Sequence, residues 1–178
     1  MKKIFLAIVF LFSLVCGWSQ KYTAEKSSVS FYSHATIEDI TAKNEKSVGI
    51  FNAAAGEIVF SIPIAEFQFP KSLMQEHFNE KYMDTEKFPK ASFKGKVTGY
   101  DAAATGVQQA KAVGKLNIHG VERDVEIPGA IEKSGDKLLF KTKFIVKLED
   151  YKIDRPQLLW QNIAEQVEVT ADFVFKPQ

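Results

Sequence analysis

The sequence predicts an all-β protein, a single antiparallel β-barrel of about eight strands with one helix at about residues 71–82. Most segments alternate apolar and polar residues, which is the period of a strand with one buried face. Only the residues after Pro70 show the spacings of three and four that are typical of a helix. No strand–helix–strand rhythm appears, so the sheet is expected to be antiparallel. A β-sandwich is the alternative, because its pattern overlaps with that of a barrel.

The clearest element is a hairpin over residues 110–128. Gly120 lies at the break between its arms and supplies the positive φ that a tight turn needs. Val113 breaks the alternation of the first arm. The inward positions of that arm are mostly small, which predicts a thin wall and an interior that side chains need not fill: Ala110, Ala112, Gly114, Leu116 and Ile118.

Further strands are predicted wherever the same alternation recurs. The predicted helix begins after Pro70 and places Leu73, Phe78 and Tyr82 on one face. Residues 34–47 are polar and are predicted to form a loop or a frayed strand pair, and residues 150–164 a long connection. The other strands are expected at residues 27–33, 48–51, 56–64, 91–100, 137–149 and 167–175.

Length and composition indicate one ordinary globular domain. The chain has 178 residues, of which 46% are hydrophobic and 25% are charged. The fifteen phenylalanines are the exception, and they predict an aromatic core or an aromatic-lined cavity.

Residues 1–19 have the pattern of a signal peptide. Lys2 and Lys3 precede an apolar run over residues 4–15, which is too short to span a bilayer comfortably. Gly17 and Ser19 are small residues that suit cleavage after Ser19. An uncleaved anchor is the alternative. We therefore expect a periplasmic or secreted protein whose domain covers residues 20–178 and has no stable membrane span.

The single cysteine and the charge balance exclude several other classes. Cys16 follows Val15 rather than the small residue that a lipoprotein signal requires, so we expect it to be removed without lipidation, leaving no disulfide. Removal of Lys2 and Lys3 leaves 21 basic residues against 22 acidic ones. This balance gives no overall basic field for nucleic acid, which is not expected as a partner.

Three segments together resemble the YceI-like family of exported, lipocalin-like proteins. They are residues 114–121 (GKLNIHGV), residues 78–93 with the run KFPKASF, and the start SVSF with His34, followed by Gly49 to Phe51 and Gly56. The resemblance covers nearly the whole mature chain. It implies a helix packed over an extended barrel and a long apolar tunnel that holds an isoprenoid, an isoprenoid quinone or a similar amphiphilic lipid. The sequence departs from the family pattern at residues 61–69 and 149–156, which bears on the identity of the ligand.

The predicted ligand contacts follow from the inward phase of the strands together with this resemblance. For any one of these residues, core packing is an equally good interpretation. Arg123 is in phase with the inward residues and is a candidate head-group contact; the alternative, which we favour, is a side chain that extends to water near the start of its strand. The contacts are Phe31, Phe51, Phe60, Phe69, Phe93, Leu116, Ile118, Phe140, Phe144 and Phe173.

No pattern in the sequence predicts catalysis or a metal site. His77 and Glu80 form an i, i+3 pair without an identifiable third ligand, and His119 is expected to serve the turn. No nucleophile–base motif or phosphate-binding loop is present. We therefore expect a binding protein that is not an enzyme, has no cofactor, takes an amphiphilic lipid as its partner and is a candidate homodimer. A solid barrel with a structural or interaction role is the first alternative, and a lipid-modifying enzyme is the second.

Overall fold

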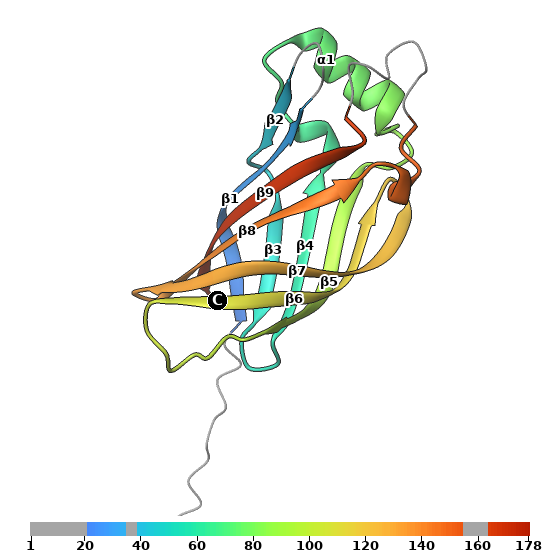
Figure 1. The fold of residues 1–178 in the computed structure, drawn as a ribbon. Coiled ribbons are helices and arrows are strands. Elements are labelled where there is room, and N and C mark those ends of the chain that lie inside the picture. The colour runs from blue at the N-terminus through green and yellow to red at the C-terminus, as the bar shows by residue number, and fades with distance from the viewer. Residues whose placement is uncertain (1–20, 35–38, 155–163) are drawn as a thin grey trace, which may run out of the picture.

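The computed structural model describes residues 21–34, 39–154 and 164–178. Within these residues nine strands form one antiparallel sheet, and pairing of the first strand with the last closes it into a barrel (Figure 1). The strands are β1 (Lys21–Ser33), β2 (Ile40–Asn44), β3 (Val48–Asn52), β4 (Glu57–Pro63), β5 (Lys90–Thr98), β6 (Val107–Ile118), β7 (Val121–Ser134), β8 (Lys137–Lys147) and β9 (Gln166–Pro177). The closing pair excludes the sandwich alternative.

β2 and β3 occupy a single position in the barrel wall. β2 pairs with the second half of β1 and β3 with its first residues, in one continuous register in which Val29 faces Asn44 and Thr23 faces Ile50. Together they act as one interrupted strand, so the described barrel has eight strand positions, as the sequence predicts. Of the two alternatives predicted for residues 34–47, the loop is wrong over β2, where the chain forms a strand paired with β1.

Asn44 explains why a strand forms in this polar stretch. The residue is fully buried, and its Nδ2 donates a hydrogen bond to the carbonyl of Pro63 over 2.7 Å. Its Oδ1 accepts hydrogen bonds from the Lys46 amide at 2.8 Å and the Ser47 hydroxyl at 3.1 Å. Because a buried amide costs free energy unless it is paired, these three bonds let the chain bend between β2 and β3 inside the wall.

The hairpin between β6 and β7 has the predicted form. His119 and Gly120 make the turn, with φ of 51° and 73°, so both central residues are left-handed as in a type I′ turn. The two strands pair over their whole shared length, from Val107–Glu132 to Ile118–Val121. Val113, which breaks the alternation, points outward and is exposed.

The helix lies across one end of the barrel (Figure 1). It consists of α1 (Ser72–His77), continued by the π-helical segment η2 (Phe78–Tyr82), which confirms the prediction of a helix at about residues 71–82. The predicted inner face is wrong at its first residue, because Leu73 is 59% exposed. Two 3₁₀ turns complete the described elements, η1 (Ile64–Glu66) and η3 (Glu149–Tyr151). No helix in the described part of the chain is long and apolar enough to cross a membrane.

Candidate ligand-binding cavity

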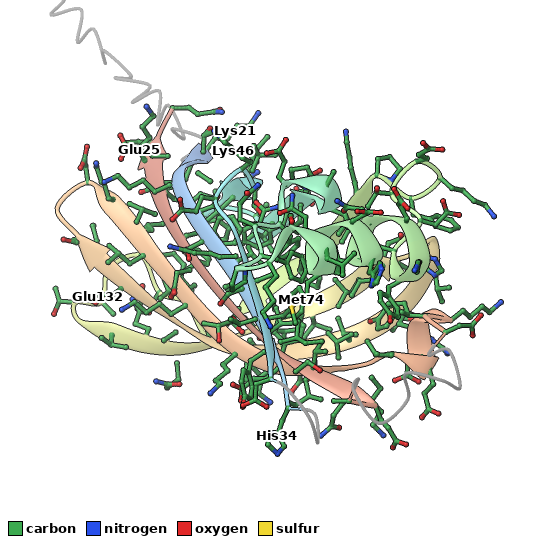
Figure 2. All side chains as sticks on the ribbon, turned by 90° about the horizontal axis from the view of Figure 1, so that it is seen from above. Lys21, Glu25, His34, Lys46, Met74 and Glu132 are labelled. Carbon is green, nitrogen blue, oxygen red and sulfur yellow. The ribbon has the colours of Figure 1, made fainter. Side chains whose placement is uncertain are left out.

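A cavity of about 400 Å³ occupies the interior of the barrel beneath the helix. Residues of β1, β2 and β4 to β9 form its wall, and α1 and η2 cover it. In Figure 2, which looks down on the helix, Met74 projects from α1 over the strands of the barrel. The volume lies within the range of roughly 300–1,000 Å³ that is typical of small-molecule pockets.

The opposite end of the barrel is filled by side chains. Phe51, Leu138 and Phe175 are fully buried there. The Phe51 ring lies 5.8 Å from that of Tyr100 and 5.1 Å from that of Phe140, centroid to centroid. These edge-to-face contacts, worth about 0.5–1.5 kcal/mol each beyond burial, make a solid plug that forms the floor of the cavity.

A second aromatic cluster forms the roof. Phe31 stacks on Phe78 of η2 with the ring centroids 5.6 Å apart, and Phe78 also contacts Phe67 and Phe69 at 5.7 and 5.0 Å. All four rings line the cavity. The helix is therefore held over the barrel end by apolar contacts on the side that faces the cavity.

Small residues on adjacent strands keep the middle of the wall thin. Ala110 of β6, Gly129 of β7 and Thr142 of β8 stand side by side in register, and all three line the cavity. Gly114, which the sequence predicts as part of a thin wall, and its cross-strand partner Gly95 serve a different purpose. A Cβ on Gly114 would clash with the Lys94 carbonyl, so this pair allows close approach of β5 and β6 instead.

The lining is almost entirely apolar. Among its described residues there is no Asp, Glu or Arg, and its lysines are Lys111 and Lys141, whose positions in their strands point outward. Ser33, His77 and Tyr82 bring polar groups to the end near the helix. Burial raises the pKa of the Tyr82 phenol above its ordinary value, and the neutral phenol can donate a hydrogen bond.

Nine of the ten predicted contacts line the cavity, namely Phe31, Phe60, Phe69, Phe93, Leu116, Ile118, Phe140, Phe144 and Phe173. Phe51 does not, because it is packed in the plug below the floor. Arg123, the candidate head-group contact, is exposed and lies outside the lining; its Nε donates a hydrogen bond to the Asp150 carbonyl over 2.9 Å.

Several lining residues are absent from the sequence prediction. Met74 and Phe78 reach the cavity from the helix, and Val167 and Val169 reach it from β9. The alternation of β9 already carries the signal for the two valines. Predicting Met74 would require the rotation of the helix about its own axis, and spacings of three and four residues do not determine that rotation to within one residue.

The three histidines lie apart from one another. His34 Nδ1 is 2.8 Å from Asp39 Oδ1 at an exposed edge, and Tyr32 donates a hydrogen bond to the other oxygen of Asp39. His119 Nδ1 is 3.3 Å from the Tyr151 carbonyl, so the turn residue also holds η3. The described residues contain no group of three or more His, Cys, Asp or Glu that could hold a metal ion.

The closed antiparallel barrel, the covering helix and the apolar cavity described above define a lipocalin-like barrel. The model of the YceI-like domain matches residues 21–175, and the chain belongs to the YceI-like family. The predicted signal peptide at residues 1–19 lies outside the described residues, and the domain boundary at residue 20 stays a prediction.

Solved structures with low sequence identity share this fold. A polyisoprenoid binding domain from Saccharophagus degradans has a TM-score of 0.76 at 16% identity, over 88% of this chain and 98% of that one. BcnA from Burkholderia cenocepacia has a TM-score of 0.71 at 19% identity, over 83% and 95%. A YceI protein from Campylobacter jejuni has a TM-score of 0.62 at 16% identity, over 82% and 88%. No curated protein matches the chain.

Proposed function

We propose that this protein is an exported binding protein that holds a long apolar amphiphile, an isoprenoid, an isoprenoid quinone or a similar lipid, inside its barrel. The observation that carries the proposal is the cavity of about 400 Å³ whose described lining contains no Asp, Glu or Arg. Such a lining gains free energy from burying a hydrocarbon chain, roughly 25 cal/mol per Å² of apolar surface removed from water. It penalises a charged group that enters without a partner.

The head group is placed by this proposal at the helix end of the cavity. Ser33, His77 and Tyr82 are the polar lining residues there, and an uncharged head group would find hydrogen-bonding partners among them. The YceI-like family supports the lipid ligand. So does the polyisoprenoid binding domain among the similar structures, although its 16% identity carries only the fold. Export to the periplasm or the medium is proposed from the pattern of residues 1–19.

Binding, rather than catalysis, fits the chemistry of the lining. Proton transfer requires positioned acid and base groups, and the cavity wall is built almost entirely of hydrocarbon side chains. The solid-barrel alternative requires an interior filled by side chains, and the cavity argues against it.

Native mass spectrometry of the purified exported protein, followed by organic extraction, tests the proposal. We expect a bound species that is released as an isoprenoid, a quinone or a related lipid. An unliganded mass that does not change after incubation with polyprenyl lipids and fatty acids would contradict the proposal. N-terminal sequencing of the same sample tests cleavage after Ser19, and fractionation of the cells tests export.

A pair of variants on β6 provides the matched control. Ala112→Phe fills the cavity from the wall and should reduce lipid binding at least ~10-fold, since a ring replaces volume that the ligand needs. Val113→Phe adds the same side chain at the neighbouring, exposed position and should bind as the wild type does. Equal binding by the two variants would place the ligand outside the barrel.

A further inference from the structure

Among the described residues, β7 and β8 separate along part of their length and leave a seam in the wall of the barrel. The ladder that joins these strands runs from Ser134–Lys137 only as far as Gly129–Thr142. Beyond that pair, the first half of β7 is paired to β6 alone and the second half of β8 to β9 alone. Figure 1 shows the two ribbons together at their hairpin and apart towards the helix end. We define the seam as residues 121–128 of β7 facing residues 143–147 of β8.

The sequence specifies this edge. Pro128 has no amide hydrogen to donate, and the Thr142 hydroxyl donates to its carbonyl over 2.5 Å at the point where the ladder ends. The outward positions of β7 beyond it are Glu122, Asp124 and Glu126. Charged residues and proline are the features by which natural strands protect an unpaired edge from wrong pairing. These residues therefore indicate that this side of β7 is a strand edge that stays unpaired.

Side-chain bonds, rather than a ladder, close the seam at its upper end. Arg123 Nε donates to the Asp150 carbonyl over 2.9 Å, and His119 Nδ1 approaches the Tyr151 carbonyl at 3.3 Å. Both contacts join the start of β7 or its turn to η3, which follows β8 directly. The seam thus has two defined ends, Thr142–Pro128 below and Arg123–Asp150 above.

The cavity reaches the seam from inside. Ile127 on one side and Phe144 and Val146 on the other line the cavity. Along β4, β5 and β9 only alternate residues line it, whereas β7 lines it with five consecutive residues, Ile127 to Ile131, of which Ile127 and Pro128 belong to the seam. Outside, Ile145 is 52% exposed among charged neighbours. Apolar residues therefore stand on both faces of the wall at the seam.

We propose that this seam is a lateral gate through which the hydrocarbon chain of a lipid enters and leaves the cavity. The inference rests on the proposed function and adds a route to it. Separating two paired strands would break a row of backbone hydrogen bonds, each worth about 0.5–1.5 kcal/mol net. Widening the seam breaks none between these segments, so it costs less than separating paired strands. The alternative route passes beneath the helix, where the roof rings would have to separate.

Cross-linking the seam tests the gate. If the ladder continued in register, Glu126 would face Ile145, and Glu126→Cys with Ile145→Cys places two thiols on the outer surface of the seam. Cys16→Ser removes the single natural cysteine. The pair is joined by oxidation or by bis-maleimides of increasing length. Glu132→Cys with Leu139→Cys is the matched control, since these residues already face each other in the same ladder.

The readout is the rate at which a fluorescent long-chain prenol enters and leaves the protein. We expect the seam cross-link to slow both rates at least ~10-fold, with the dissociation constant within about twofold, because a gate changes rates and not affinity. The linked control and the unlinked seam variant should exchange at the wild-type rate. Binding with unchanged exchange in the linked seam variant, or a seam pair that no reagent joins, would overturn the gate alone. Failure of every protein to bind the prenol, the unlinked ones included, would overturn the proposed function and the gate with it.

Discussion

The two ends of this barrel are both rich in phenylalanine, yet one is solid and the other hollow. At the closed end, the ring of Phe51 packs against those of Tyr22, Tyr100 and Phe140, and Phe51 is fully buried. Towards the helix, the rings of Phe93 and Phe144 share the interior with Ala110, Ala112 and Gly129. The size of the neighbouring residues, not the number of rings, decides whether an aromatic interior becomes core or cavity.

This difference implies that similar substitutions have different effects at the two ends. A ring removed from the plug leaves a void that close-packed neighbours cannot fill, whereas a ring removed from the cavity wall enlarges a space that already exists. Stability should therefore depend on the closed end and ligand affinity on the hollow one.

The largest effect should come from Phe51→Ala in the plug. We expect it to lower the free energy of unfolding by about 3–5 kcal/mol, because Phe51 is fully buried and contacts three other rings. Denaturant unfolding monitored by circular dichroism measures this loss. Phe144→Ala, which removes the same ring from the cavity wall, is the matched variant and should cost less than half as much. Equal losses would remove the distinction between plug and cavity.

A smaller effect is expected at the roof. Phe78→Ala removes the ring that contacts Phe31, Phe67 and Phe69, and should lower stability by about 1–2 kcal/mol and weaken lipid binding several-fold, since Phe78 is only half-buried. Thermal unfolding and titration with a lipid measure the two effects. Leu73→Ala on the exposed side of the same helix should change neither. If the two variants behaved alike, the helix would not be held by its cavity-facing side.

Alternation along the strands predicted the hairpin and the buried faces, but it left barrel and sandwich open, and the pairing of β1 with β9 decides between them. Nine of the ten residues named from the sequence as ligand contacts line the cavity, and their contact with a ligand stays a prediction. Alternation identifies the inward face but not the height along the barrel axis. Phe51 and Phe60 are both in phase, and only the three-dimensional packing shows that one lies in the plug and the other faces the cavity. The position of a ring along the axis depends on strand pairing across the whole sheet, which is not local information.

Other features of the fold depend on individual contacts that cannot be predicted from the composition of a segment. The polar sequence of β2 left a loop and a frayed strand open. The strand forms because the end of β1 offers an edge and Asn44 finds its partners in Pro63, Lys46 and Ser47. Gly114 was predicted to keep the wall thin, but with its partner Gly95 it allows the backbones of β5 and β6 to approach closely. The hairpin predicted from the sequence ends at Pro128. That the pairing of β7 with β8 also stops beside this residue follows only from the register of β8.

The smallest effect should be a pH dependence at the closed end. Lys137 Nζ on β8 donates to Glu25 Oε2 on β1 over 2.5 Å, and this hydrogen bond holds the pKa of the Glu25 carboxyl below its ordinary value. A carboxyl with a lowered folded-state pKa stabilises the fold above its unfolded pKa and loses that contribution as the pH falls through the folded value.

Glu25→Gln should therefore lower stability slightly at pH 7 and not at all once the pH is below both pKa values. The pair is exposed, so water and salt screen it and the difference should be near the limit of detection. Unfolding curves of the wild type and of Glu25→Gln at neutral and acidic pH measure it, with Glu45→Gln, whose pKa is lowered by Lys43 within the same short segment, as the comparison. Of these two carboxyls, Glu25 is the one that joins strands on opposite sides of β9. A larger effect for Glu45→Gln would therefore show that the charges at the closed end do not contribute to its closure.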